Sequence, residues 1–145
     1  MNAGAALRDA VPTRLHGDSW RGVAGGRVEL LAARCARCQA LFLPRMLTCT
    51  ECGGNAFTEA VLSPEGTLYS FTIVRGSGGV WPEVYAVGYV DYPEGVRVFG
   101  HLRSAEFDRL AIGARVRTEE ATLYTTKDGT PARCFRFALV SASSN

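Results

Sequence analysis

The stretch CARCQALFLPRMLTCTECGG, residues 35–54, holds four of the five cysteines in this chain of 145 residues. The four form two Cys-x-x-Cys pairs, Cys35 with Cys38 and Cys49 with Cys52, and ten residues separate the pairs. Such a pair is typical of a tight turn that directs two sulfurs at one point, and two facing turns make a tetrahedral thiolate site. The spacing predicts a rubredoxin-like zinc ribbon over 34–56, in which these four cysteines bind one structural Zn²⁺ ion.

Iron binding and redox chemistry are the alternatives to zinc binding for the four cysteines. Iron accepts the same sulfur ligands, and the sequence does not distinguish the two metals. A redox pair typically occurs once, at a helix N-terminus in a βαβ unit, and no such unit is predicted here. Because four thiolates complete the coordination shell, we expect the metal to stabilise the fold and not to catalyse a reaction. Metal binding supplies on the order of 10 kcal/mol in zinc-finger peptides.

The residues after the ribbon predict a small β-barrel. Turn signals, YPEG at 92–95 and KDGT at 127–130, separate segments rich in β-branched and aromatic residues. A short helix is expected over 104–113, between the third and fourth of these segments. Five strands with a helical connection at this point are the layout of the OB-fold. The five predicted strands are 66–76, 83–92, 96–103, 114–126 and 131–140.

The residues before the ribbon are expected to form an extension. A short helical turn is predicted over 17–26, with Asp18 or Ser19 as its N-cap and a glycine pair as its stop. A strand over 27–35 then leads into the first cysteine pair. The predicted chain is mainly β, and its segments are an N-terminal extension with a short helix (1–33), the zinc ribbon (34–56) and the OB-fold barrel (57–145).

Charge and hydropathy narrow the classes of function. The chain has 16 basic and 14 acidic residues, a net charge of +2, and no basic run. This is a weak footprint for a nucleic-acid-binding protein, so no nucleic-acid partner is expected. No apolar stretch approaches the roughly 20 residues that span a bilayer, and the N-terminus has no apolar segment typical of a secretory signal. A cytoplasmic protein without a membrane partner is therefore expected.

The sequence offers no recognisable catalytic set. It contains no GxSxG, Walker or HExxH motif. Neither His16 nor His101 has a sequence context that indicates catalysis, and Cys134 is predicted to be a small buried residue of the last strand. We expect that the chain is not catalytic alone, with no catalytic residues of its own.

Candidate contact residues lie near the second barrel strand and on the ribbon. Alternation places Val84, Ala86, Gly88 and Val90 on one face and Tyr85, Val87 and Tyr89 on the other. The smaller set suits the barrel interior, which leaves Tyr85 and Tyr89 outside, with Trp81 in the preceding loop. Such aromatic residues can stack on bases, anchor a protein interface, or pack beneath the ribbon or the extension. On the ribbon, Phe42 belongs to an apolar hairpin expected to dock on the barrel or on a partner, and Arg45 can bind an anion or form an exposed ion pair.

Several motifs together give the chain a family resemblance. Residues 18–140 contain ARCARCQALFLPRMLTCTECGG, PEGTLYSFTIVRG, YAVGYVDYPEGVRVFGHL and IGARVR in this order. With these motifs the chain resembles the acyl-CoA-associated zinc-ribbon/OB-fold proteins, long catalogued as a domain of unknown function. It departs from their usual pattern in FLPR, where two prolines are common, and in CTEC, where Cys-Pro often opens the second turn. Neither departure changes a predicted metal ligand.

The resemblance implies a partner and a role. Proteins of this family are similar to small subunits of thiolase-superfamily enzymes, in which the large chain carries the nucleophilic cysteine. The small chain stabilises the assembly and shapes the channel for CoA or acyl-CoA, and a heterotetramer with two of each chain is expected, in acyl-CoA conversions such as β-oxidation. Three alternatives remain: a subunit of a MaoC-like enoyl-CoA hydratase, a single-stranded nucleic-acid-binding OB-fold protein, and an enzyme using Cys134.

Overall fold

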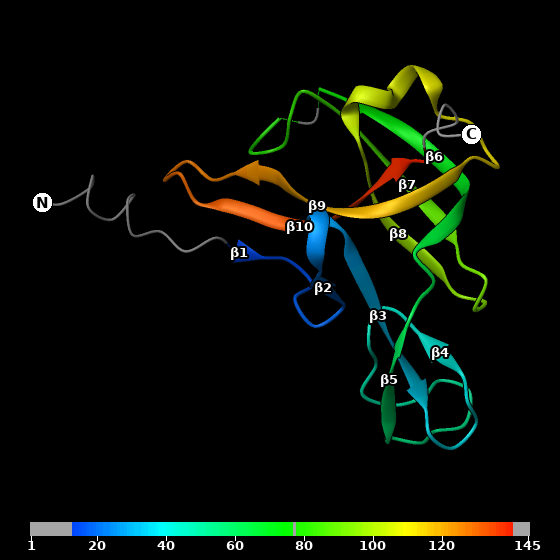
Figure 1. Cartoon of the computed structure of the whole chain (residues 1–145). Coiled ribbons are helices and arrows are strands. Elements are labelled where there is room, and N and C mark those ends of the chain that lie inside the picture. Colours follow the sequence, from blue (N-terminus) through cyan, green and yellow to red (C-terminus); the bar gives the residue numbers. More distant parts are fainter. Residues whose placement is uncertain (1–12, 77, 141–145) are drawn as a thin grey trace, which may run out of the picture.

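Strands make up nearly all of the regular structure in the computed structural model, which describes residues 13–76 and 78–140 (Figure 1). Two short 3₁₀ helices, η1 (Ala24–Gly26) and η2 (Ser104–Arg109), accompany them, and these two described ranges contain no α-helix. None of the helices described is long and apolar enough to cross a membrane. The strands are β1 (Thr13–Arg14), β2 (Trp20–Gly22), β3 (Val28–Cys35), β4 (Leu41–Phe42), β5 (Phe57–Val61), β6 (Glu65–Arg75), β7 (Val84–Asp91), β8 (Arg97–Leu102), β9 (Arg115–Thr125) and β10 (Pro131–Leu139).

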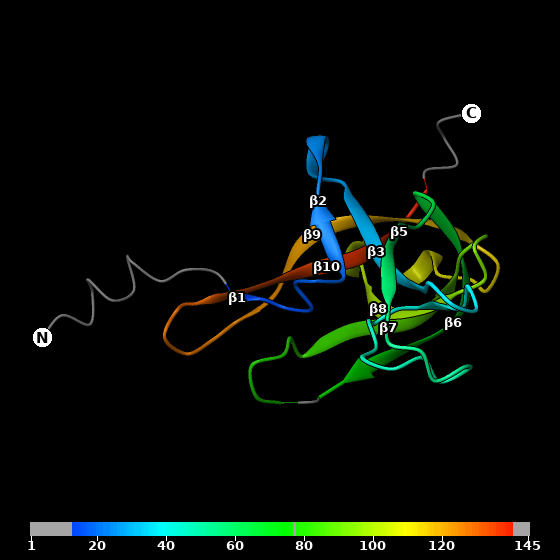
Figure 2. The same cartoon turned by 90° about the horizontal axis from the view of Figure 1, so that it is seen from below.

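Strands β6 to β10 close into a five-stranded barrel. Antiparallel pairing joins β6 to β7 and β7 to β8, a parallel pairing joins β8 to β10, and β9 pairs antiparallel with both β10 and β6. The view from below shows these strands around a common interior (Figure 2). This strand order is that of an OB-fold, so the predicted barrel is confirmed. The first and last residues of each predicted strand lie within one residue of those observed.

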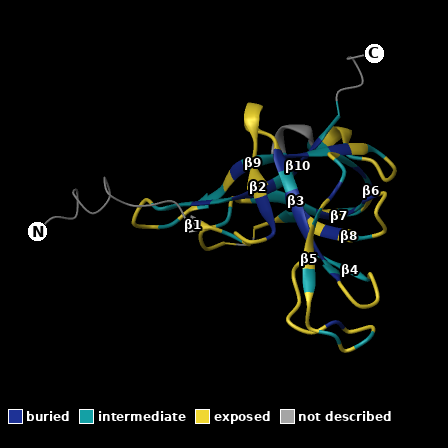
Figure 3. Cartoon of the chain, turned by 60° about the horizontal axis from the view of Figure 1, so that its bottom comes forward, coloured by how far each residue is buried: buried dark blue, intermediate teal, exposed yellow. Residues whose placement is uncertain are grey.

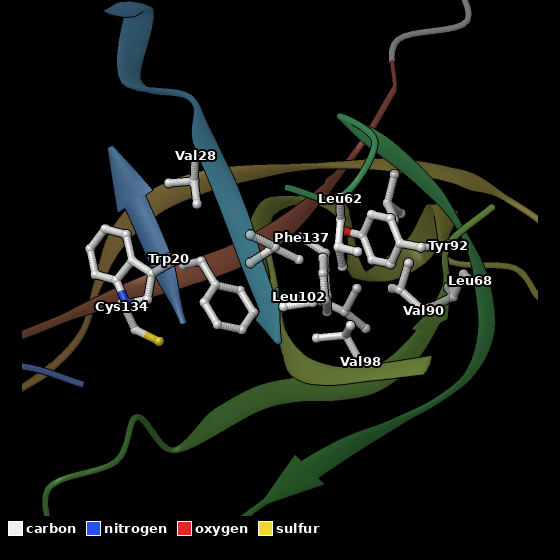
Figure 4. Close-up of a cluster of buried hydrophobic side chains, with 14 of the residues drawn as sticks. Trp20, Val28, Leu62, Leu68, Val90, Tyr92, Val98, Leu102, Cys134 and Phe137 are labelled. Atoms are coloured by element: carbon white, nitrogen blue, oxygen red, sulfur yellow. The ribbon is translucent and has the colours of Figure 1, made fainter. Parts of the chain in front are cut away.

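The barrel interior is built by the alternation predicted for β7. Ala86, Gly88 and Val90 are buried, whereas Tyr89 is exposed. The core continues from the barrel to the side chain of Trp20, which lies next to Cys134 at one end of the cluster (Figure 4). A single core therefore includes residues of the barrel and of β2, and it fixes the N-terminal strands against the barrel.

A second sheet carries the ribbon. Its central strand is β3, which pairs antiparallel with β2, β4 and β5. The first part of β3 lies beside β9, where the Thr118 hydroxyl donates a hydrogen bond of 2.9 Å to the Val28 carbonyl. The far end of β3 reaches the ribbon, whose loops are mostly exposed (Figure 3). Because Phe57–Val61 pairs with β3, the ribbon sheet continues past residue 56. The division of the chain into a ribbon over 34–56 and a barrel over 57–145 stays a prediction.

The predicted helical turn over 17–26 is wrong. Trp20–Gly22 is instead a strand, and Trp20 pairs with Leu30 of β3. The Trp20 side chain is fully buried, and its indole N–H donates a hydrogen bond of 2.7 Å to the Leu15 carbonyl. Burial of this large ring and pairing with β3 outweigh the capping signal of two small polar residues. Only η1 is helical here, and residues 1–12 of the predicted extension lie outside the described residues.

Candidate metal centre and exposed aromatic surface

The four ribbon cysteines converge on one point. Their Sγ atoms all lie within 4.8 Å of one another. The Sγ atoms of Cys35 and Cys52 are 3.6 Å apart, as are those of Cys38 and Cys49. Four sulfurs at Zn–S distances of about 2.3 Å would lie about 3.8 Å apart at the corners of a tetrahedron. The arrangement can therefore hold one metal ion with four sulfur ligands.

The two cysteine turns have the same backbone hydrogen bonds. In the first turn the Arg37 N–H points at the Cys35 sulfur at 3.4 Å, and the Gln39 N–H donates to the Cys35 carbonyl at 2.9 Å. In the second turn Glu51 and Gly53 make the equivalent contacts to Cys49, also at 3.4 and 2.9 Å. Both Gln39 and Gly53 have positive φ, near 70° and 79°, so the last position of each turn is left-handed. The glycine adopts this conformation without steric cost.

The turns favour thiolate at the site. Backbone N–H groups of Cys38 and Arg37 are the main cause that lowers the pKa of the Cys35 thiol to about 6. For Cys38 the backbone of Ala40 lowers the pKa, but desolvation and the neighbouring thiols outweigh it and raise the pKa to about 12. One negative charge thus forms readily at Cys35, and a second one at Cys38 is disfavoured. A divalent cation relieves this repulsion, which agrees with a metal-binding donor set.

The ribbon hairpin packs partly on the barrel. Leu41 and Leu43 contact the core cluster, and the Phe42 ring meets Phe57 edge-on at 6.2 Å. Leu47, by contrast, is 93% exposed. Arg45 forms an exposed ion pair of 3.4 Å with Glu59. The hairpin therefore has apolar side chains packed on the core, an exposed leucine and a paired arginine.

Three rings stack on the outer face of the barrel. Trp81 lies 5.0 Å from His101 at an interplanar angle of 11°, and 5.4 Å from Tyr85 at 27°. The edge of Tyr124 meets Trp81 at 4.7 Å. Burial lowers the pKa of His101, so the imidazole in this stack is neutral at neutral pH. Trp81 and Tyr85, predicted from sequence as contact candidates, thus lie together.

A second aromatic group lies further along β7 and β8. Tyr89 faces Phe99 across the strands at 5.3 Å, and the two are 44% and 51% exposed. Arg97 lies over the ring of Tyr69 at 3.4 Å and forms an ion pair of 2.6 Å with Asp91. Sequence analysis missed Phe99, although it alternates with the buried Val98 and Gly100 and the same period-2 argument would have placed it outside.

A hollow of about 320 Å³ joins this group to the ribbon. Leu43 and Pro44 of the hairpin line one side, and Tyr89, Arg97 and Phe99 line the other. Of the predicted contact residues, Tyr89 therefore lies near the hairpin. Trp81 and Tyr85 belong to the separate stack near the other end of β7.

The thiol outside the ribbon has the properties of a core residue. Cys134 is 4% exposed, and burial raises the pKa of its thiol to about 11. A nucleophilic cysteine needs a lowered pKa, so this thiol is poorly suited to catalysis. The adjacent carboxylates Glu119 and Glu120 each pair with an arginine, Arg136 at 2.7 Å and Arg133 at 3.3 Å. Both carboxylates therefore have ion-pair partners on β10.

A two-turn cysteine ribbon, whose central strand β3 packs beside β9 of a closed OB-fold barrel, defines the class of this protein. A family model for the C-terminal OB-fold domain of ChsH2 matches residues 59–119. The chain belongs to the ChsH2/DUF35 family of OB-fold proteins.

Three proteins are similar to this chain in sequence. The chain is 32% identical over 128 residues to benzoylsuccinyl-CoA thiolase subunit BbsA of Thauera aromatica, which covers 86% of this chain and 87% of the relative. It is 30% identical over 118 residues to BbsA of Geobacter metallireducens, covering 81% of this chain and 79% of that one. It is 26% identical to a DUF35 domain-containing scaffold protein of Methanothermobacter thermautotrophicus, covering 68% and 75%.

Two solved structures share the fold. The Ltp2-ChsH2(DUF35) aldolase superposes with a TM-score of 0.60 and 24% identity, covering 74% of this chain and 84% of that chain. A DUF35 protein of unknown function from Sulfolobus solfataricus superposes with a TM-score of 0.52 and 14% identity, covering 77% and 76%. The match to the family model and the identity to the BbsA proteins confirm the sequence-based resemblance to this family.

Proposed function

We propose that this chain is a non-catalytic, zinc-binding subunit of an acyl-CoA thiolase or acyltransferase complex. The observation that carries the proposal is the 32% identity, over 86% of the chain, to a protein named as a subunit of benzoylsuccinyl-CoA thiolase. A subunit of this kind stabilises the thiolase chain and shapes the channel through which CoA and acyl groups reach the catalytic site.

The metal in this proposal is one structural zinc ion held by Cys35, Cys38, Cys49 and Cys52. Four converging sulfurs and a closed coordination shell support this choice, because zinc accepts tetrahedral thiolate ligands without a redox change. The ion would fix the ends of β3 and of the hairpin. Iron accepts the same four sulfur ligands, so elemental analysis must distinguish zinc from iron.

The division of labour assigns the chemistry to the partner. Thiolases act through a cysteine nucleophile, and the thiol of Cys134 is buried with a raised pKa. The nucleophile is therefore expected on the thiolase chain. Because thiolases are dimeric, the proposed assembly has two copies of each chain.

The aromatic residues on the outer face of β7 and β8, with Trp81 of the loop before β7, form the proposed contact surface. Tyr and Trp are enriched in interfaces because they bury a large apolar area and retain a polar group. Trp81 and Tyr85 form one contact point, and Tyr89 forms another beside the ribbon hairpin. The hairpin with Phe42 and Arg45 is proposed to lie at the partner or at the CoA entrance.

Single-stranded nucleic acid is the second candidate ligand of this surface. Exposed Tyr89 and Phe99 on an OB-fold, with Arg97 nearby, are the elements of a base-stacking platform. However, Arg97 is paired with Asp91, and the chain has a net charge of only +2. Both properties weaken attraction to phosphate, so a protein partner is favoured.

Co-expression with a thiolase-superfamily chain of the same organism tests the proposal. We expect the two chains to co-purify at equal stoichiometry, and we expect thiolytic activity only from the complex. Size-exclusion chromatography with light scattering measures the mass, and CoA-dependent cleavage of a 3-oxoacyl-CoA measures the activity. A monomeric small chain that ignores the thiolase, or full activity and solubility of the thiolase alone, contradicts the proposal.

A further inference from the structure

A pocket of about 190 Å³ lies at the closing seam of the barrel. The seam is short, because β8 and β10 pair at only two positions, His101 with Arg136 and Leu102 with Phe137. Before these positions β8 continues as Phe99 and Gly100, and β10 continues as Cys134 and Phe135. All four of these residues line the pocket, which therefore occupies the unpaired part of the seam.

Flat and apolar side chains make the pocket walls. Leu15 and Leu123 contribute aliphatic surface, and Phe99 and Phe135 contribute rings. The parallel pair Trp81 and His101 and the ring of Tyr124 complete the wall. Aromatic rings pack favourably against other rings in offset or edge-on geometry, so walls of this kind suit a flat occupant.

Two titratable groups of the pocket lining, His101 and Cys134, are neutral near neutral pH. Burial lowers the pKa of His101 and raises the pKa of the Cys134 thiol to about 11, so both groups are neutral. The positive charge of Arg14 slightly opposes this rise in the pKa of Cys134. The Arg14 guanidinium lies 3.7 Å over the Trp20 ring and donates a hydrogen bond to the Trp20 carbonyl. The lining contains no Asp, Glu, Lys or Arg, so a charged ligand group would lose its hydration here without such a side chain in the lining to pair with.

The size of the pocket matches a single ring. An engineered protein cavity of about 150 Å³ with aliphatic and aromatic walls stays dry and binds benzene. The seam pocket is slightly larger, at about 190 Å³. The hollow of about 320 Å³ beside the ribbon shares His16, Phe99 and Phe135 with it, so a substituent on the ring could continue outward.

We propose that the seam pocket binds an uncharged six-membered ring of a small molecule, with the ring plane against Trp81 and His101. The site is formed within this chain alone, so it does not depend on the thiolase partnership. Shape, the aromatic walls and the absence of a paired charge all select the same class of ligand, a neutral aromatic or alicyclic group.

Titration of the full-length chain with toluene, followed by the amide NMR signals of labelled protein, tests this site. We expect saturable shifts at His101, Leu123 and Cys134. Benzoate has the same ring with a carboxylate. We expect it to bind at least roughly tenfold more weakly than toluene, because its charge would be unpaired. No saturable shift, shifts confined to other regions, or equal binding of benzoate would overturn the proposal.

Two variants at one position locate the site. Cys134→Leu adds side-chain volume inside the pocket and should abolish toluene binding, whereas Cys134→Ala leaves the space open and should retain it. If Cys134→Leu does not fold, Leu123→Trp obstructs the pocket from β9 and should give the same loss. Toluene shifts that persist in a folded obstructing variant would overturn the proposal. Because no partner is present in these experiments, their failure leaves the thiolase proposal untouched.

Discussion

Gly88 on β7 lies directly opposite Gly100 on β8, and neither position has room for a Cβ atom. A Cβ on Gly88 would lie 2.5 Å from the carbonyl oxygen of Ser70, and a Cβ on Gly100 would lie 2.7 Å from Cε2 of Phe137. The glycine pair thus lets the β6 backbone approach β7 closely and lets Phe137 fill the barrel interior. Sharp coiling of a small barrel depends on such contacts.

Replacing either glycine by alanine is expected to destabilise the barrel. Overpacking typically costs about 1–3 kcal/mol, and Gly88→Ala should cost more than Gly100→Ala because backbone adjusts less easily than a ring. Urea unfolding measures the difference. Gly22→Ala is the matched control, since its Cβ would meet only the flexible carboxylate of Glu120, at 3.2 Å. Equal stability of all three variants would contradict the prediction.

Local sequence patterns were sufficient to predict the barrel strands and the convergence of the four ribbon cysteines. Period-2 alternation in β7 separated Ala86 from Tyr89, and the Cys-x-x-Cys spacing brought four sulfurs together. Both depend on residues close in sequence. The strand at Trp20 could not be predicted this way, because its stability comes from a partner ten residues away and from a core formed by the whole chain.

The pairing of β8 with β10 could not be predicted from the sequence either. Its two residue pairs join segments more than thirty residues apart, and no local signal marks where the pairing stops. The ring stack has the same origin, because Trp81, Tyr85, His101 and Tyr124 come from a loop and three strands. Only closure of the barrel brings these residues together.

Loss of one ribbon cysteine should remove the metal. We expect one zinc per chain in freshly purified protein by elemental analysis, and we expect that Cys38→Ser lowers the metal content and the solubility. Metal binding contributes on the order of 10 kcal/mol in comparable modules, so the ribbon should unfold without it. Cys134→Ser is the control, because this thiol lies outside the ribbon cluster. Native protein without zinc or iron would contradict the prediction.

Stability should depend on the protonation of His101. Burial lowers the folded-state pKa below the ordinary value of 6.5, so the unfolded chain binds the proton more readily. The stability from neutral His101 is therefore present above about pH 6.5 and is lost as the pH falls through the lower, folded-state pKa. The free energy of unfolding of the wild type should fall relative to His101→Gln between about pH 7.5 and 5. Parallel pH profiles of the two proteins would contradict this reasoning.

Nucleic acid should bind weakly and without specificity. The net charge is +2, and the exposed Arg97 beside the aromatic surface is neutralised by Asp91. We expect that any binding of a labelled single-stranded oligonucleotide disappears at about physiological salt, because few counterions are released. Fluorescence anisotropy over a salt series measures this. Tight binding at that salt would favour the nucleic-acid function over the thiolase complex.

Truncation of the aromatic residues at the proposed contact surface should weaken the thiolase complex. Tyr89 is 44% exposed beside the ribbon hollow, and Trp81 and Tyr85 stack at the other end of β7. Removing a central aromatic anchor typically costs about 2 kcal/mol, or roughly thirtyfold in affinity. Tyr89→Ala, Tyr85→Ala and Trp81→Ala should each weaken the complex by this order, as measured by titration of the purified thiolase chain.

The control for the contact surface is Ile112→Ala, which removes a side chain that is 72% exposed and lies after η2. Its affinity for the thiolase should stay close to that of the wild type. Melting temperatures of the isolated variants separate a lost contact from a damaged barrel, which matters most for Trp81 because it contacts three other rings. If Ile112→Ala weakens the complex and the three aromatic variants do not, the interface lies on the η2 side of the barrel and the assignment to β7 and β8 is wrong.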